Sequence, residues 1–225
     1  MKHPLTIALM SLALAATPFA AAAQLSPLKA VAAADDLVKS GDAASLDEAF
    51  ALYLSAAEGG AVWGQYNAAE MLYEGRGVAQ DRARAAKLYG QAADQDNLWA
   101  QYKLGLMLMK GDGVAPQPSR AVTLLDAAAM KGNIWANYEL GDAYLQGQAI
   151  PRDLTRAKFY LERAAEQNNA WALLRLGEMY RDGLGVPASP ADATVLFEQA
   201  AVQKNGFALV ALARMIAPKD AARAR

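Results

Sequence analysis

The chain has 225 residues, of which 54% are apolar, and its 22 basic and 23 acidic residues give a formal net charge of −1 at pH 7. This near-neutral balance argues against a general nucleic-acid binder, because such proteins carry a strongly basic surface. The chain contains no cysteine, which excludes disulfides, thiolate metal sites and a lipidated N-terminal cysteine. About 200 residues of this composition can build a sizeable core, either in one domain or in an array of repeats.

The N-terminus has the pattern of a cleavable signal peptide. A short cationic start precedes an apolar run over residues 5–16, which is too short to span a bilayer. Alanines at the Ala21-x-Ala23 positions suit signal peptidase, so we expect residues 1–23 to be removed and Gln24 to begin the mature chain. That chain has 21 basic and 23 acidic residues and no second long apolar run. We therefore expect a periplasmic or secreted protein with no membrane span.

A repeat interval of 36 residues indicates the architecture. All four tryptophans and one phenylalanine follow this interval without insertion or deletion: Trp63, Trp99, Trp135, Trp171 and Phe207. Leu104, Leu140 and Leu176 keep the same interval, and pairs of alanines begin at positions 92, 128, 164 and 200. A period of this length is typical of stacked supersecondary units.

Each unit contains two helical patterns. Residues 99–109 and 119–130 both place apolar side chains three and four positions apart, as amphipathic helices do. The second helices are expected to begin after positions 81, 117, 153 and 189, which carry Asp, Gln, Asp and Ser, with proline following at 118 and 190. One interval earlier, residues 45–48 have the form of a capping box, which predicts that Ser45 caps the second helix of a degenerate first unit.

These patterns predict one solenoid domain over residues 24–217. The expected parts are a degenerate unit (26–60), four repeats (61–96, 97–132, 133–168 and 169–204), a capping helix (206–217) and a flexible tail (218–225).

Residues 176–186, with the sequence LGEMYRDGLGV, carry a specific resemblance. The Leu-Gly pair, the Gly-x-Gly-Val turn and the following helix ending in Ala-Ala resemble the Sel-one-like repeat family, which is related to tetratricopeptide repeats. The resemblance covers nearly the whole mature chain. It implies an all-α, right-handed α-solenoid of about five 36-residue helix-turn-helix repeats plus a C-terminal capping helix, with the first helices lining the concave face.

Two copies depart from the family pattern. The first repeat has Ala69 where later repeats have glycine, and the third loop reads Gly147-Gln148-Ala149-Ile150, without its second glycine. We expect a different backbone path in that third loop.

The Gly-x-Gly-Val loops at residues 75–78, 111–114 and 183–186 raise the question of phosphate binding. A phosphate loop follows a strand and brings a Lys-Ser/Thr pair or a distant acidic residue, whereas these loops recur after helices and bring neither. We interpret the first glycine of each as the left-handed end of a helix. No nucleotide or other cofactor is therefore predicted.

Catalytic motifs are weak in this chain. The mature protein has neither histidine nor cysteine, and we predict no catalytic and no metal-binding residue. Ser26 and Lys29 match the S-x-x-K motif of penicillin-recognising enzymes but lack its partner motifs, and we interpret the match as chance. Some cysteine-rich members of the repeat family bind or hydrolyse β-lactams. An enzyme acting on a cell-wall or β-lactam substrate is therefore kept as a less favoured hypothesis, behind the two binding hypotheses given below. The acidic residues Glu70, Glu74, Asp142, Glu178 and Asp182 are interpreted as a solvated face.

The aromatic side chains give the candidate binding site. By the helical period, Trp99 and Tyr102 lie on the face of their helix opposite the Leu104 core stripe, and the resemblance to tetratricopeptide-like proteins implies that these columns line the concave face. The predicted site consists of Trp63, Tyr66, Trp99, Tyr102, Trp135, Tyr138, Trp171 and Phe207, with Trp99 and Trp135 as central anchors. An alternative is that these rings only pack one first helix against the next.

The resemblance to exported relatives in signalling, envelope assembly and exopolysaccharide production implies a non-enzymatic interaction scaffold or regulator in a bacterial envelope. A protein or peptide partner is the leading hypothesis. A polysaccharide stacked on the tryptophans is the alternative.

Overall fold

The computed structural model describes residues 25–216, and within this range the chain forms eleven α-helices and no strand. The helices are α2 (Pro27–Ser40), α3 (Ala43–Glu58), α4 (Val62–Glu74), α5 (Arg82–Asp94), α6 (Leu98–Lys110), α7 (Pro118–Met130), α8 (Ile134–Gln146), α9 (Leu154–Glu166), α10 (Ala170–Asp182), α11 (Pro190–Val202) and α12 (Gly206–Ile216). The predicted signal peptide at residues 1–23 and the predicted tail at residues 218–225 lie outside the described residues.

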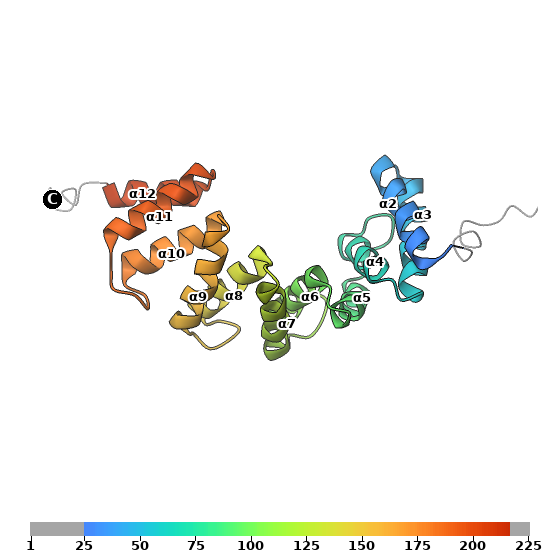
Figure 1. The fold of residues 1–225 in the computed structure, drawn as a ribbon, viewed down its shortest axis with the longest axis horizontal. Coiled ribbons are helices and arrows are strands. Elements are labelled where there is room, and N and C mark those ends of the chain that lie inside the picture. Colours follow the sequence, from blue (N-terminus) through green and yellow to red (C-terminus); the bar gives the residue numbers. More distant parts are fainter. Residues whose placement is uncertain (1–24, 217–225) are drawn as a thin grey trace, which may run out of the picture.

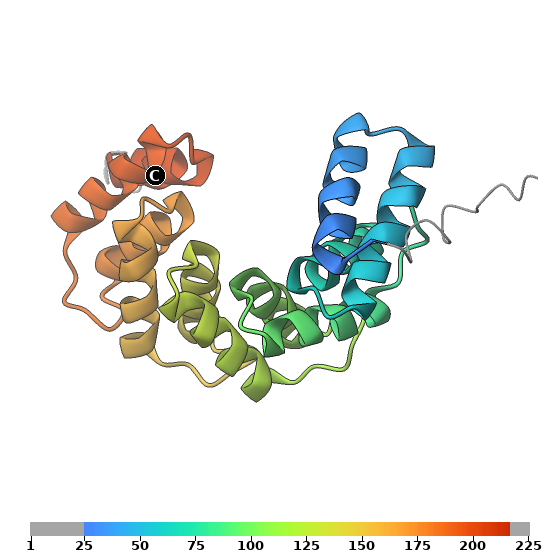
Figure 2. The same ribbon diagram turned by 45° about the vertical axis from the view of Figure 1, so that its right-hand side comes forward.

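The helices follow one another as antiparallel hairpins along an arc. In Figure 1, α4, α6 and α8 lie toward the inside of the arc and α5, α7 and α9 toward the outside. Figure 2 shows the arc as a U, with α2 at the top of one arm and α12 at the top of the other. The all-α solenoid fold is therefore confirmed, with α12 as a single helix at its C-terminal end.

The second helices of the repeats begin where their capping residues predict. The Asp81 carboxylate accepts a 2.9 Å hydrogen bond from the backbone N–H of Arg84, and Asp153 and Ser189 cap α9 and α11 in the same way. Pro118 and Pro190 occupy the first turns of their helices, where the missing N–H has no partner to lose. Polar side chains thus cap three of the four starts, whereas Gln117 makes no side-chain cap and α7 begins at Pro118.

The prediction that Ser45 caps α3 is wrong. The helix begins at Ala43, and the carboxylate of Asp42 accepts hydrogen bonds from the backbone N–H of Ser45 at 3.0 Å and from its hydroxyl at 2.6 Å. These hydrogen bonds lower the pKa of Asp42 to about 2, the Ser45 hydroxyl contributing most. The helix starts one turn earlier because a carboxylate is available there to accept the free N–H groups of the first turn.

The first helices have their own capping column, which the sequence reasoning missed. In each of the last four first helices, α6, α8, α10 and α12, a buried asparagine accepts backbone N–H groups: Asn97, Asn133, Asn169 and Asn205. These asparagines stand 36 residues apart, so the signal was present in the sequence.

The Gly-x-Gly loops end helices, as predicted. Gly75, Gly111, Gly147 and Gly183 close α4, α6, α8 and α10 in the left-handed conformation, with φ between 69° and 74°. The residue that follows the first glycine also bonds back to the helix in three of the loops: Arg76 to Met71, Asp112 to Met107 and Leu184 to Met179. In the described chain Gln148 makes no such bond and Ala149 is not left-handed, so the third loop does follow a different path.

The core is built from alanines and leucines between neighbouring helices. Glycines in the first helices allow the second helices to approach closely: an added Cβ at Gly105 would lie 2.7 Å from Leu125 Cγ, and one at Gly141 would lie 2.6 Å from Leu161 Cγ. Leu125, Leu161 and their counterpart Phe197 are fully buried. The repeats therefore bury one face of each first helix and leave the opposite face to the inside of the arc.

Candidate functional site: the inner face of the first helices

The candidate site centres on a row of five aromatic side chains near the N-terminal ends of the first helices. This aromatic row consists of Trp63, Trp99, Trp135, Trp171 and Phe207, whose exposed fractions are 50%, 41%, 44%, 38% and 65%. Each ring shares a helix with a buried stripe, such as Leu104 and Leu108 in α6. Large aromatic side chains at these positions thus remain accessible in every repeat.

The rings make two kinds of contact. Trp63 meets Tyr66 edge-on at 5.7 Å between ring centroids, and Trp135 meets Tyr138 edge-on at 6.5 Å, in both cases within one helix. Trp171 instead contacts Phe207 of the following helix, at 5.5 Å and an interplanar angle of 46°. Packing between adjacent first helices therefore explains the last pair, whereas Trp63 and Trp135 pack on their own helix and keep a large exposed fraction.

The tyrosines of the predicted site lie deeper than the tryptophans. Tyr66, Tyr102 and Tyr138 are half-buried. Burial raises the pKa of Tyr102 to about 12 and is also the main cause of the raised pKa of Tyr66 and of Tyr138. All three phenols are therefore neutral at physiological pH, where each offers an apolar ring with one polar tip.

Charged residues on the same helices pair across the repeat boundaries. Lys103 Nζ lies 2.9 Å from a Glu70 carboxylate oxygen, and Arg175 Nε lies 2.7 Å from Asp142 Oδ1. Glu70 also accepts a hydrogen bond from the phenol of Tyr89, the buried partner of its own hairpin. We call these contacts, with the looser Lys110–Glu139 contact, the ion-pair ladder.

Lys110 and Glu139 form the loosest contact of the ladder. Their charged atoms are 3.6 Å apart, and the side chain of Glu139 is only 25% exposed. Burial raises the pKa of Glu139, Lys110 lowers it, and the nearby Asp142 raises it, with burial the largest effect. The ladder therefore pairs six charged side chains of the first helices with one another across the repeat boundaries.

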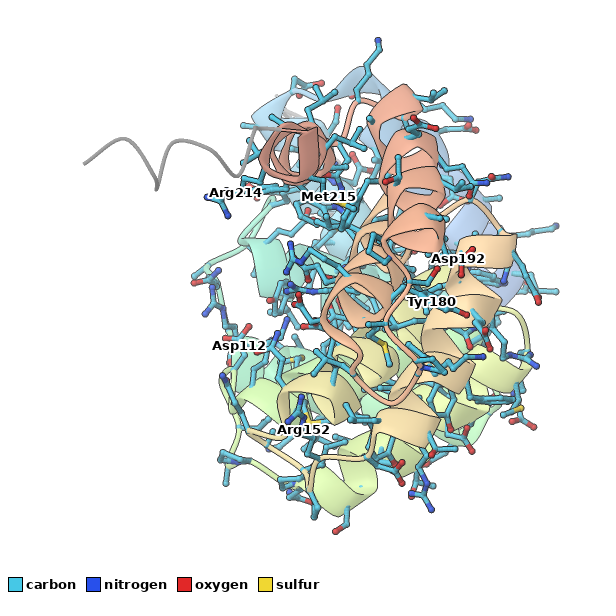
Figure 3. All side chains as sticks on the ribbon, turned by 90° about the vertical axis from the view of Figure 1, so that its left-hand side faces the viewer. Asp112, Arg152, Tyr180, Asp192, Arg214 and Met215 are labelled. Atoms are coloured by element: carbon cyan, nitrogen blue, oxygen red, sulfur yellow. The ribbon has the colours of Figure 1, made fainter. Side chains whose placement is uncertain are left out.

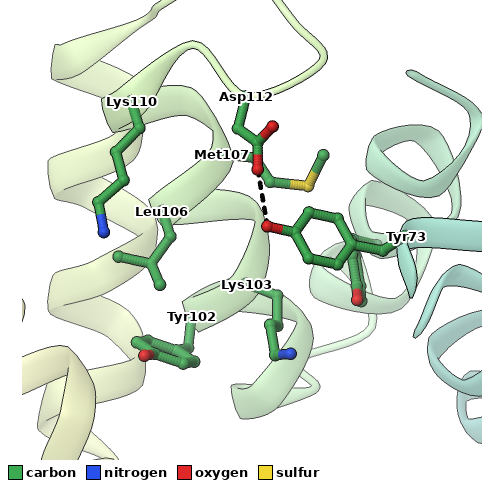
Figure 4. A pocket seen from close by; sticks show the side chains of 8 residues that line it. Tyr73, Tyr102, Lys103, Leu106, Met107, Lys110 and Asp112 are labelled. Carbon is green, nitrogen blue, oxygen red and sulfur yellow. Dashed lines mark hydrogen bonds between the residues drawn. The ribbon is translucent and has the colours of Figure 1, made fainter. Parts of the chain in front are cut away.

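A small pocket lies where the first two repeats meet (Figure 4). It has a volume of about 160 Å³, and its lining includes Tyr73, Tyr102, Lys103 and Asp112. Tyr73 donates a 2.6 Å hydrogen bond to Asp112, which also accepts one from Arg82 at 2.6 Å. The Asp112 interaction is the main cause of the raised pKa of Tyr73.

The acidic residues considered as catalytic candidates do not gather at one point. Each is close to a basic side chain: Glu70 to Lys103, Glu74 to Arg76, Asp142 and Glu178 to Arg175, and Asp182 to Arg181. Ser26 and Lys29 are exposed around the first turn of α2. Among residues 25–216, no three acidic or histidine side chains are grouped so that they could hold a metal ion.

The sequence reasoning missed the residues that join the repeats. Lys103 belongs to no motif, Asp112 was noted only as the variable residue of the loop at 111–114, and Lys204, which lines the same pocket as Phe207, was not selected. The sequence does show a regular spacing of charges: Lys103 follows Glu70 by 33 residues, and Arg175 follows Asp142 by 33 residues. Whether the members of each pair meet depends on how neighbouring first helices lie together.

Comparison with known proteins identifies the repeat. The Sel1 repeat model matches residues 41–60, 64–97, 100–133, 136–169 and 172–205. The chain belongs to the Sel1 repeat family. Members of this family typically act as scaffolds for protein–protein interaction.

Solved structures of the family share the fold. A Sel1 repeat protein from Oxalobacter formigenes is 26% identical, with a TM-score of 0.75, over 85% of this chain and 79% of that one. The protein c5321, a protective antigen of uropathogenic Escherichia coli with an SLR fold, is 28% identical with a TM-score of 0.73. That match covers 85% of this chain but 44% of c5321, so this chain spans less than half of that protein. No curated protein matches the chain.

Within residues 25–216, none of the helices combines the length and the apolar character needed to cross a membrane.

Proposed function

We propose that this protein is an exported, non-enzymatic scaffold of the bacterial envelope that captures a protein partner on the inner face of its solenoid. The observation that carries the proposal is the aromatic row, because five large rings at one interval of 36 residues keep 38–65% of their surface exposed. Exposed aromatic side chains in a regular array are a typical recognition surface, since interface energy concentrates on such residues. The family's usual role in protein–protein interaction supports the same conclusion.

The partner engages Trp99 and Trp135 most strongly. These rings occupy the middle of the row, 41% and 44% exposed, and central aromatic side chains tend to dominate binding because their neighbours exclude water around them. The ion-pair ladder is largely self-neutralised, so the contact is mainly apolar, with the tyrosine hydroxyls and rim charges fixing orientation.

The test is capture of binding partners by the mature protein from an envelope extract. The double variant Trp99→Ala/Trp135→Ala should lose the captured protein while it keeps its helical circular dichroism. Phe159→Ala is the matched control, because Phe159 is also 45% exposed but lies on α9, on the outside of the arc. Equal capture by the wild type and the double variant would refute the proposed inner-face site.

The same rings also suit the faces of sugar units, and a titration separates the two partners. Tryptophan emission of the mature protein should remain unchanged when neutral or alginate-like polysaccharide is added. A saturable change that disappears in the double variant would instead identify a carbohydrate partner.

Export is tested separately. The proposal requires the protein to accumulate in the periplasm or the medium with Gln24 at its N-terminus, which N-terminal sequencing detects. An uncleaved protein that stays in the cytoplasm would contradict an envelope role. The inner-face proposal would then be judged by the capture experiment alone.

A further inference from the structure

The last repeat boundary carries a residue that does not suit its backbone conformation. At the turn before each first helix one residue is left-handed, with φ between 60° and 89°: Gly60, Asp96, Gly132, Asn168 and Lys204. Glycine, asparagine and aspartate tolerate this conformation, whereas a lysine there is disfavoured. Non-glycine residues in strained conformations are enriched at functional sites, so the left-handed conformation of Lys204 makes it a candidate functional residue.

The ammonium group of Lys204 has no partner among the described residues. It makes neither an ion pair nor a side-chain hydrogen bond within residues 25–216, and the residue is exposed. The equivalent Asp96, by contrast, lies 2.7 Å from Lys131 Nζ. The charge of Lys204 is therefore available to a ligand.

An apolar pocket lies next to this free charge. It has a volume of about 400 Å³, and Trp171, Phe207 and Val210 provide its apolar surface, with Lys204 as its one charged lining residue. Asn205, which also lines it, uses its side-chain oxygen to cap α12, so that oxygen is already occupied. Figure 3 views the array from this end, with α11 and α12 nearest the viewer; Arg214 points away from the body of the protein.

We propose that this pocket binds the C-terminal residue of a partner chain. The apolar side chain of that residue would lie against Trp171 and Phe207, and its α-carboxylate would contact the ammonium group of Lys204. A chain-terminal apolar residue carries both groups on one Cα, so a single residue satisfies the pocket and the charge together. This inference rests on the proposed capture function and specifies one end of the partner.

The test compares two fluorescein-labelled pentapeptides that end in phenylalanine, one with a free carboxylate and one with a C-terminal amide. In fluorescence polarisation at low salt, the free acid should bind about tenfold more tightly than the amide. Lys204→Asn should lower the affinity for the free-acid peptide to that for the amide. It should not disturb the turn, because asparagine already adopts this conformation at Asn168. Trp171→Ala should lower the affinity for both peptides.

The controls distinguish this site from the rest of the inner face. Lys131→Asn removes the same charge at another repeat boundary and should leave both affinities unchanged. Equal binding of acid and amide, an unaffected Lys204→Asn variant, or no binding of either peptide by the wild type would overturn the inference. So would equally tight binding of an amidated peptide with aspartate beside the phenylalanine. None of these results touches the capture test, which depends on Trp99 and Trp135.

Discussion

Tyr73 and Asp112 connect two consecutive repeats through one hydrogen bond of 2.6 Å between the phenol and the carboxylate. Arg82 holds the other carboxylate oxygen at 2.6 Å, so the loop after α6 is tied to both helices of the preceding hairpin. In a repeat array the stability of the whole depends on such boundary contacts, because each unit touches only its neighbours.

The Tyr73→Phe variant tests this contact. Removing the hydroxyl should lower the free energy of unfolding by about 1 kcal/mol, the usual net worth of a hydrogen bond, because Arg82 still satisfies the carboxylate in part. Urea unfolding followed by circular dichroism measures the loss. Tyr102→Phe is the control, since the described structure gives its hydroxyl no hydrogen bond, and an equal effect in both variants would contradict the role of Asp112.

Alanine substitutions at two loop glycines distinguish the effect of steric overlap on stability from the effect of backbone strain. Gly113 and Gly132 have φ of 73° and 89°, so alanine costs about 1 kcal/mol at either from conformation alone. An added Cβ at Gly113 would also overlap the side chain of Arg82 and lie 3.2 Å from its backbone, whereas Gly132 has nothing within 4 Å. Gly113→Ala should therefore lower the urea midpoint clearly more than Gly132→Ala does; equal midpoints would show that the loop does not press on α5.

Two helical glycines should respond in opposite directions to alanine. A Cβ at Gly177 would overlap the ring of Phe197, which is fully buried and has no room to move, so Gly177→Ala should cost about 2 kcal/mol. Gly90 has only Leu104 Cδ2 at 3.9 Å, and alanine there should raise stability by about 0.5–1 kcal/mol through helix propensity. Thermal unfolding gives both signs, and destabilisation by Gly90→Ala would show that the space beside it is already filled.

Glu139 should make stability depend on pH. Because burial raises its pKa in the folded protein above the ordinary 4.5, the folded state holds this proton more tightly than the unfolded chain. The resulting stabilisation is fully present below pH 4.5 and is lost as the pH rises through the folded pKa. Glu139→Gln lacks this loss, so it should gain stability relative to the wild type between pH 4.5 and neutrality.

The measurement is a series of urea midpoints for the wild type and Glu139→Gln at several pH values. Lys110 opposes the effect of burial, so the same series in a Lys110→Met background should show a larger gain. A wild-type advantage that grows with pH would mean that the contact with Lys110 outweighs burial.

The repeat interval was sufficient to predict the fold. Trp63 to Phe207 gave the register, and Asp81, Asp153 and Ser189 placed the starts of the second helices, because capping depends on residues a few positions apart. The same local reasoning gave the wrong start for α3. Both Asp42 and Ser45 can cap a helix, and in the structure the carboxylate of Asp42 is the cap.

The contacts between repeats were beyond the reach of sequence. The Trp171–Phe207 contact and the Asp142–Arg175 pair depend on the distance and angle between neighbouring first helices, which a periodic pattern does not specify. The exposed fractions of the tryptophans depend on the same geometry. Whether the aromatic row binds a partner therefore stays a prediction, which the exposed fractions of its rings in the structure support.

The third loop gives the array one joint unlike the others. Gly77, Gly113 and Gly185 bring their loops against the start of the preceding second helix, but Ala149 carries a side chain there, and a pocket of about 630 Å³ lies between its loop and Pro118 at the start of α7. This loop connects α8 to α9 and meets the start of α7, so it lies at the boundary between the repeat of Trp99 and the repeat of Trp135. At that boundary an open pocket therefore takes the place of the close glycine contact that the other three loops make with the preceding hairpin.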